Sequence, residues 1–179
     1  RVKGADILFA VLLLGAFLPY QIFLYPMVRA FSMVGLYNTL FCIVIVHVIF
    51  GLPIMTLIFR NFYAGLPVEL FNAARVDGGG FFRIFWNVIL PMSTPILIVA
   101  AILQITNIWN DFILGLVFAG RENLPMTVQL NNVFNSTYGE REYNLNMAAT
   151  ILTAAVPLLV YFVSGRWFVR GIAAGAVKG

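Results

Sequence analysis

Residues 30–59 read AFSMVGLYNTLFCIVIVHVIFGLPIMTLIF and hold no Asp, Glu, Lys or Arg. A helix rises about 1.5 Å per residue, so roughly 20 apolar residues cross the hydrocarbon core of a bilayer. The run is longer than that, and it is continuously apolar rather than alternating, which favours a helix over a strand of a membrane barrel. The sequence therefore predicts a transmembrane helix here.

The rest of the chain has the same character. Of its 179 residues, 61% are hydrophobic and 10% are charged, whereas a soluble domain has about 25% charged residues. Three further stretches without charged residues are long enough to cross a membrane: 7–28, 84–110 and 143–165. We therefore expect an all-α, polytopic transmembrane bundle with four spans. The single cysteine, Cys42, lies inside an apolar run, so the chain offers no cysteine-rich metal site.

The basic residues indicate the orientation of the bundle. Four spans place both termini and the loop 60–89 on one side, and the positive-inside rule makes the side with more Lys and Arg cytoplasmic. The bases on that side are Arg1, Lys3, Arg60, Arg75, Arg83, Arg166, Arg170 and Lys178, against Arg29, Arg121 and Arg141 opposite. The net charge of +4 thus reflects topology. No aromatic and basic motif accompanies it, so we expect no nucleic-acid partner.

The loop 60–89 contains a short helix, predicted from residues 65–80, GLPVELFNAARVDGGG. Pro67 suits the first helical turn, and Glu69 complements the positive end of the helix dipole. Asp77 and Gly78 supply a left-handed stop, so the helix has about ten residues. An isolated helix of this length is marginal in water, and packing against another surface must hold it.

Two interpretations of this helix remain open from the residues alone. Glu69, Asn72 and Ala73 share one face, and the small side chains of Ala73 and Ala74 let a partner approach closely, as in a docking element. Alternatively, the helix lies in the headgroup layer, where aromatic residues gather. The aromatic residues just downstream are Phe81, Phe82, Phe85 and Trp86.

The motifs in this loop resemble those of a known family. The run Pro67-x-Glu69-Leu70-x-x-Ala73-Ala74-x-x-Asp77-Gly78, with Ile89-Leu90-Pro91 and Pro95 after it, resembles the EAA loop of binding-protein-dependent ABC importer permeases. Further motifs resemble the carbohydrate-uptake, maltose-type branch: Asn38-Thr39, Trp109-Asn110-Asp111-Phe112 and Gly171-x-x-x-Gly175-Ala176-Val177-Lys178-Gly179. The resemblance covers most of the chain.

The resemblance implies a set of partners in a bacterial inner membrane. Two permease subunits form the path, a cytosolic ABC ATPase dimer binds the paired EAA helices, and an extracytoplasmic solute-binding protein delivers a sugar. This chain would be a permease subunit and not an enzyme. It has no P-loop, so ATP and Mg²⁺ belong to the ATPase and no cofactor is expected on this chain. The implied coupling residues are Glu69, Asn72, Ala73, Ala74, Asp77 and Gly78.

The resemblance also implies a division of the chain and two departures from the family. Residues 1–179 are expected to form one ABC transmembrane domain, with a cytoplasmic EAA loop at 60–89 and an extracytoplasmic loop at 119–143. A cytoplasmic tail follows at 166–179. This tail either also touches the ATPase or is a solvated flank. Asn72 stands where the family has glutamate, and Glu69 is the nearest replacement. The family has about six helices, so the first two are expected to be missing from this chain or absent in life.

Polar residues inside the spans form two stripes. Gln104, Asn107 and Asp111 share one face of the third span, with Asn110 beside them, and Asn146, Thr150 and Thr153 follow the fourth. Polar groups in hydrocarbon must be paired or wet. One interpretation is a sugar path in which Trp109 or Phe112 stacks on a ring, and the other is interhelical hydrogen bonding. An ionised Asp111 needs a cation, water or a helix terminus.

Other classes of membrane protein fit the sequence less well. A permease for another small polar solute stays open, because the motifs do not identify the cargo. A proton-coupled carrier would need paired intramembrane acids and bases, and His47 has no acidic residue near it in sequence, so we expect a packed or hydrogen-bonded histidine. A structural subunit would carry no docking helix. A membrane enzyme would need a nucleophile and a base or a ligand cluster, and none is spaced for catalysis.

Overall fold

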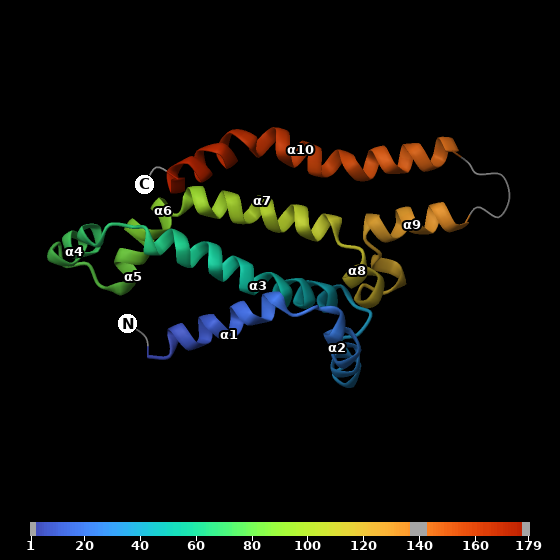
Figure 1. Cartoon of the computed structure of the whole chain (residues 1–179), viewed down its shortest axis with the longest axis horizontal. Helices are drawn as coiled ribbons and strands as arrows, with labels where there is room; N and C mark the ends of the chain where they lie inside the picture. Colours follow the sequence, from blue (N-terminus) through green and yellow to red (C-terminus); the bar gives the residue numbers. More distant parts are fainter. Residues whose placement is uncertain (1–2, 137–142, 177–179) are drawn as a thin grey trace.

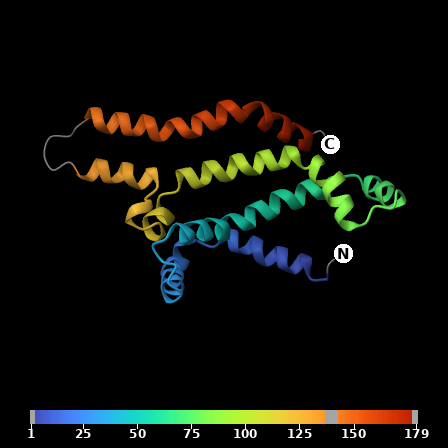
Figure 2. The same ribbon diagram turned by 180° about the vertical axis from the view of Figure 1, so that it is seen from behind.

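The computed structural model describes the backbone of residues 3–136 and 143–176, and the side chains of residues 3–135 and 143–165. Every element in these ranges is helical, which confirms the all-α fold. Four long helices lie side by side in the order α1 (Ala5–Phe17), α3 (Leu40–Ala64), α7 (Thr94–Asn110) and α10 (Tyr143–Ala176) (Figure 1). Figure 2 shows the same order from behind.

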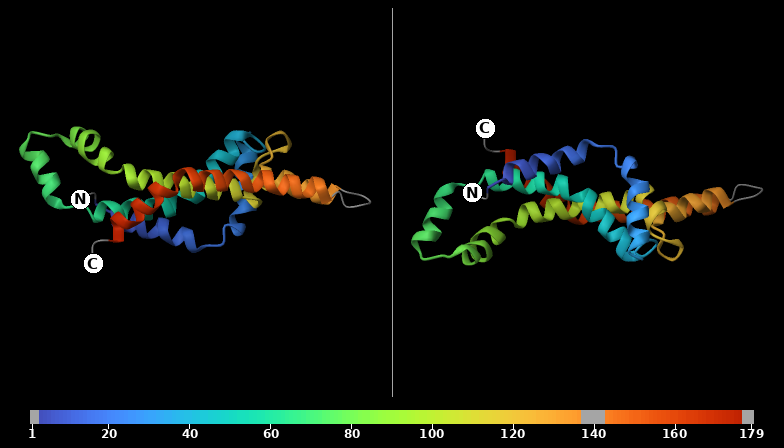
Figure 3. Two further views of the ribbon diagram at one scale, coloured as in Figure 1. Left: turned by 90° about the horizontal axis from the view of Figure 1, so that it is seen from above. Right: turned by 90° about the horizontal axis from the view of Figure 1, so that it is seen from below.

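The two ends of the molecule differ. The start of α1 and the end of α10 lie at the same end as α4 (Val68–Val76) and α5 (Phe81–Ile84), as an even number of crossings requires (Figure 1). Figure 3 shows α4 and α5 forming an arch beyond the long helices. The opposite end holds α2 (Gln21–Met33), α8 (Ile113–Phe118) and α9 (Met126–Ser136). We call these the α4 end and the α8 end.

Two helices are long and apolar enough to cross a membrane unaided. They are α3 and the part of α10 from Tyr143 to Gly165. Two further pairs qualify only when each is counted as one bent span: α1 with α2, bent by 107°, and residues 81–92 with α7, bent by 67°. The described chain therefore holds between two and four spans, and the predicted four require that both bent pairs cross.

The first predicted span, 7–28, is not a continuous helix. It breaks between α1 and α2, where Leu18 is extended with φ −77° and ψ 135°. Pro19 causes the break, because its ring disfavours helical backbone in the preceding residue and it has no N–H to donate. Alone, the thirteen residues of α1 would reach about 20 Å, which is short of the hydrocarbon core.

The second span begins later than predicted. Residues up to Met33 belong to α2, and α3 starts at Leu40. Between them the backbone turns through left-handed conformations at Gly35, with φ 71°, and Asn38, with φ 63°. The Thr39 hydroxyl then accepts a hydrogen bond from the Cys42 backbone N–H at 3.2 Å, which caps the first turn of α3.

The third predicted span, 84–110, is interrupted near its start. The chain runs through α5, a π-helical turn (Phe85–Ile89) and α6 (Leu90–Met92), then bends into α7 after Ser93. Pro95 cannot donate to the Pro91 carbonyl one turn earlier, and the Thr94 hydroxyl donates to it instead at 2.9 Å. The straight part of this span is therefore α7 alone.

The predicted outer loop, 119–143, contains a helix. The segment α9 packs against the start of α10, and its Val128 is buried. A short 3₁₀ turn (Arg121–Asn123) precedes it. Residues 137–142 lie outside the described residues. At the other end of α10, the predicted tail 166–179 continues the helix to Ala176, and residues 177–179 lie outside the description.

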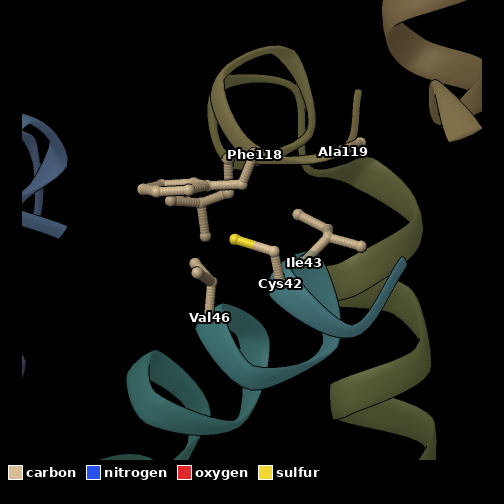
Figure 4. Close-up of a cluster of buried hydrophobic side chains, with 6 residues drawn as sticks. Cys42, Ile43, Val46, Phe118 and Ala119 are labelled. Carbon is tan, nitrogen blue, oxygen red and sulfur yellow. The ribbon is translucent and has the colours of Figure 1, made fainter. Parts of the chain in front are cut away.

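The hydrophobic core gathers at the α8 end. Side chains from the start of α3 meet side chains from α8 there, and Cys42 and Phe118 are completely buried. Figure 4 shows the Cys42 thiol and the Val46 side chain pointing toward the Phe118 ring. This cluster fixes the α8 end of α3 against the segment that follows α7. The cavity described below lies directly beside it.

Candidate functional site

The short helix predicted from residues 65–80 is present as α4. Pro67 occupies the position just before it, with φ −60° and ψ 132°, and Glu69 lies in its first turn. At its end, Gly78 has φ 76°, which confirms the predicted left-handed stop. The Gly79 N–H donates to the Ala74 carbonyl at 2.9 Å, so the chain closes tightly after the helix.

The predicted coupling residues lie on an exposed element. The side chains of Glu69, Asn72, Ala73 and Asp77 are exposed, and that of Ala74 is half-buried. Figure 1 shows α4 farther from the long helices than α5. Exposed Phe81, Phe82 and Trp86 belong to α5 and the turn after it, so an interfacial location suits that segment. The side chains of α4 itself are largely exposed, so this helix is accessible to a partner.

A cavity of about 810 Å³ lies among α1, α2, α3, α7 and α8. Four of the six predicted path residues line it: Gln104, Asn107, Asn110 and Asp111. Its aromatic lining includes Tyr20, Phe23, Phe50 and Phe112. The amide stripe predicted on the third span therefore faces a cavity that combines polar groups with aromatic rings. Phe112, one of the two rings predicted to stack on a sugar, lines this cavity.

Asp111 is held by a helix terminus, one of the three environments predicted for it. Its carboxylate oxygens accept hydrogen bonds from the backbone N–H groups of Leu114 at 3.2 Å and Gly115 at 2.8 Å, at the start of α8. The Thr127 hydroxyl donates to its backbone carbonyl. The side chain is 14% exposed. Asp111 therefore caps the turn between α7 and α8 while it lines the cavity.

His47 is a cavity residue that the sequence did not identify. It lies on α3, is 8% exposed, and its Nε2 lies 3.8 Å from the Asp111 Oδ2. That distance is too long for a hydrogen bond, so the contact is electrostatic. No acidic residue is near His47 along the chain, and the expected packed histidine is found, since its side chain is buried. Since the two residues come from different helices, no local sequence pattern could reveal the pair.

Gly51 is a second residue that the sequence did not single out. It is buried on α3 where α7 approaches, and a Cβ at this position would lie 2.6 Å from the Gln104 side-chain nitrogen. A methyl group at this position would displace the end of the Gln104 side chain. The absence of a side chain at Gly51 therefore lets the Gln104 amide lie directly against α3.

The second polar stripe, on α10, is not part of the cavity wall. The Thr150 hydroxyl donates to the Asn146 carbonyl at 2.8 Å, and the Thr153 hydroxyl donates to the Ala149 carbonyl at 2.8 Å. Asn146 is 4% exposed, and its side-chain oxygen has no hydrogen-bond partner among the described residues. Asn146 and Thr150 thus lie apart from the four residues that the cavity brings together.

Trp109 is engaged with α10 and does not line the cavity. Its indole N–H donates to the Thr153 carbonyl at 2.9 Å. Of the two rings predicted to stack on a solute, only Phe112 therefore faces the cavity. The hydrogen bond of Trp109 joins two helices, as in the second interpretation of the polar residues, interhelical hydrogen bonding.

Fold and site together define a polytopic helical membrane protein with a polar cavity between its helices and a short exposed helix at one end. The family model for binding-protein-dependent transport system inner membrane components matches residues 2–174. The chain belongs to this family, as the motifs around Pro67 predicted.

Curated relatives are permeases of ABC transporters. A probable ABC transporter permease of Pyrococcus horikoshii is 40% identical over 96% of this chain and 62% of its own length. The osmoprotective compounds uptake permease GgtD of Synechocystis is 35% identical, over 98% of this chain and 59% of its own length. The alpha-glucoside transport system permease AglG of Rhizobium meliloti is 39% identical, over 98% of this chain and 48% of its own length. The chain thus spans about half to three fifths of these relatives.

Proposed function

We propose that this chain is part of a permease subunit of an ATP-driven, binding-protein-dependent importer, and that its cargo is a sugar. The cavity is the observation that carries the proposal. Amides of Gln104, Asn107 and Asn110 each offer donors and acceptors for hydroxyl groups. Rings such as Phe112 offer an apolar face for a pyranose, and the volume of about 810 Å³ lies within the range of small-molecule sites.

The cargo assignment also uses the relatives. The alpha-glucoside permease supports a sugar, whereas the osmoprotective compounds permease supports another small polar solute. The cavity favours a neutral, hydroxylated cargo over a charged one. Its amides carry no charge, and the Asp111 carboxylate already accepts hydrogen bonds from two backbone N–H groups at the start of α8.

We infer that α4 docks on a cytosolic ATPase subunit and that the α4 end is cytoplasmic. The exposed face of Glu69, Asn72 and Ala73 supports a docking role, and the bases gathered at this end support its orientation. Glu69 then supplies the acidic contact that Asn72 cannot. To move a two-state pore from 1:99 to 99:1, ATPase binding must favour one state by about 5.5 kcal/mol, so the contact must be tight.

The docking proposal is tested with Ala73→Glu in the assembled transporter. A bulky charge on the α4 face abolishes co-purification of the ATPase while the permease still inserts in the membrane. Ala30→Glu is the matched control, since Ala30 is an exposed alanine on α2 at the α8 end. Retention of the ATPase by Ala73→Glu, or equal loss with Ala30→Glu, would contradict docking through α4.

The remaining partners are a second permease subunit and an extracytoplasmic solute-binding protein at the α8 end. The experiment is uptake into proteoliposomes that contain the full permease pair and the ATPase, with binding protein outside and ATP inside. A glucoside and a charged osmolyte, each with its own binding protein, are compared. ATP-dependent accumulation of the glucoside supports the proposal. Accumulation of the charged solute alone would reassign the cargo.

A second candidate function is a proton-coupled carrier, favoured by the His47–Asp111 contact of 3.8 Å within the cavity. The same vesicles separate the two functions. An imposed pH gradient without ATP drives uptake by a proton-coupled carrier and does not drive uptake by an ATP-dependent importer. Uptake that needs the gradient and not ATP would overturn the first proposal.

A further inference from the structure

Pro157 leaves one carbonyl of α10 without its usual partner. In a helix each backbone carbonyl accepts from the N–H four residues later. The residue four positions after Thr153 is Pro157, which lies inside α10 and has no N–H. The Thr153 carbonyl therefore needs a donor from elsewhere, since an unpaired carbonyl in a membrane protein costs free energy.

Trp109 on α7 supplies that donor. Its indole N–H lies 2.9 Å from the Thr153 carbonyl, and α7 with α10 forms the most extensive helix contact of the described chain. The Thr153 hydroxyl does not supply this donor, because it donates to the Ala149 carbonyl of its own helix. This hydrogen bond thus joins α7 to α10 at the position where Pro157 removes a backbone hydrogen bond of α10.

The position of Trp109 gives this bond its consequence. Trp109 lies in the last turn of α7, and the next two residues, Asn110 and Asp111, line the cavity. Asp111 is also the cap of α8. A shift of the Trp109 backbone would therefore move both the amide wall and the turn into α8. On the other side, α10 runs from this region to the α4 end (Figure 1).

We propose that Trp109 is a positioning residue for transport: its hydrogen bond to the carbonyl left free by Pro157 holds the end of α7, and with it Asn110 and Asp111, against α10. Trp109 does not touch the solute. The long helix α10 then connects the α4 end to the cavity, in parallel with the path through α4 itself. This connection rests on the proposed function of the chain as a permease, whereas the bond itself does not.

A double-mutant cycle tests the pairing of Trp109 with the gap made by Pro157. Trp109→Phe keeps an aromatic ring and removes the N–H, and Pro157→Ala gives the Thr153 carbonyl a backbone donor. In the assembled transporter, we expect Trp109→Phe to lower the solute-stimulated ATPase rate about fivefold, the equivalent of one net hydrogen bond, with basal ATPase unchanged. With Pro157→Ala present, Trp109→Phe should cost less than twofold.

The control and a direct readout accompany the cycle. Tyr25→Phe is the matched control, because it also removes a donor from an aromatic side chain, and Tyr25 is exposed on α2 and does not line the cavity. It should leave the stimulated rate unchanged. In parallel, hydrogen exchange of the Trp109 indole is followed by NMR of the ¹⁵N-labelled complex, with the resonance assigned by its loss in Trp109→Phe. We expect slow exchange, which Pro157→Ala accelerates.

The outcomes separate this inference from the proposed function. Fast indole exchange, or equal losses from Trp109→Phe with and without Pro157→Ala, would overturn the pairing. A loss of thermal stability with unchanged stimulation would make Trp109 a purely structural residue and would also overturn the proposal. Slow exchange of the Trp109 indole in a complex whose ATPase no tested solute stimulates would support the Trp109–Thr153 hydrogen bond. It would count against the proposed permease function instead.

Discussion

Asp111 has two roles to separate, since it lines the cavity and caps α8, and its substitution gives the most informative test of the site. Asp111→Ala leaves the Leu114 and Gly115 N–H groups without their acceptors, which lie at 3.2 and 2.8 Å in the native protein. Loss of a helix cap costs about 0.5 to 2 kcal/mol, and a cap that accepts from two N–H groups belongs at the upper end of that range. We expect a total near 2 kcal/mol, or roughly thirtyfold in the folding equilibrium.

Asp111→Asn distinguishes the cap from the charge. Asparagine caps helices about as well as aspartate, and its single carbonyl oxygen retains one of the two acceptors. We therefore expect it to cost less than about 1 kcal/mol. The assay is reversible unfolding of the purified permease in mixed micelles, followed by helical circular dichroism, together with solute-stimulated ATPase activity in the assembled transporter.

Asn110→Ala is the matched control for Asp111. Asn110 lines the same cavity one residue earlier and is exposed, so its loss should change stability by less than about 0.5 kcal/mol and lower transport. The reasoning about Asp111 would be refuted if Asp111→Ala and Asp111→Asn left the stability unchanged but abolished stimulation equally. That result would make Asp111 a solute ligand instead of a cap.

Two glycine substitutions test close approaches with controls from the same chain. Gly51→Ala places a Cβ 2.6 Å from the Gln104 side chain, so we expect weaker solute stimulation. Gly165→Ala is the control, because a Cβ there meets no atom within 4 Å and Gly165 does not line the cavity. Equal effects of the two substitutions in the uptake assay would contradict the packing of Gln104. Gly79→Ala places a Cβ 2.6 Å from the Ala74 carbonyl oxygen and should weaken ATPase co-purification, whereas Gly80→Ala meets nothing within 4 Å and should not. Intact ATPase binding in Gly79→Ala would show that the closure after α4 does not shape the docking helix.

The sequence predicted those parts of the structure whose causes are local. The end of α4 was predicted from Asp77 and Gly78, because glycine readily adopts the left-handed conformation that ends a helix. The all-α class was predicted from apolar runs long enough to cross a membrane. The stripe of Gln104, Asn107 and Asp111 follows from helical periodicity, which also places it on one wall of the cavity.

What could not be predicted depends on contacts between distant segments or on the direction of a kink. The break at Pro19 follows from the chemistry of proline, but the bend of 107° between α1 and α2 depends on packing at the α8 end. The approach of His47 to Asp111, and the room that Gly51 leaves for Gln104, join α3 to the end of α7. Trp109 looked like a stacking ring because its partner, the Thr153 carbonyl, carries no side-chain signal.

The most direct test of the central claim is the accessibility of α4. The only native cysteine of this chain, Cys42, is buried in the core, so Ala73→Cys introduces one reactive thiol on the exposed face of α4. We predict that a membrane-impermeant maleimide labels Cys at position 73 only from the cytoplasmic side, and that the bound ATPase blocks the labelling. Labelling from the outside, or labelling that the ATPase does not affect, would contradict the claim that this helix couples an ATPase to the cavity.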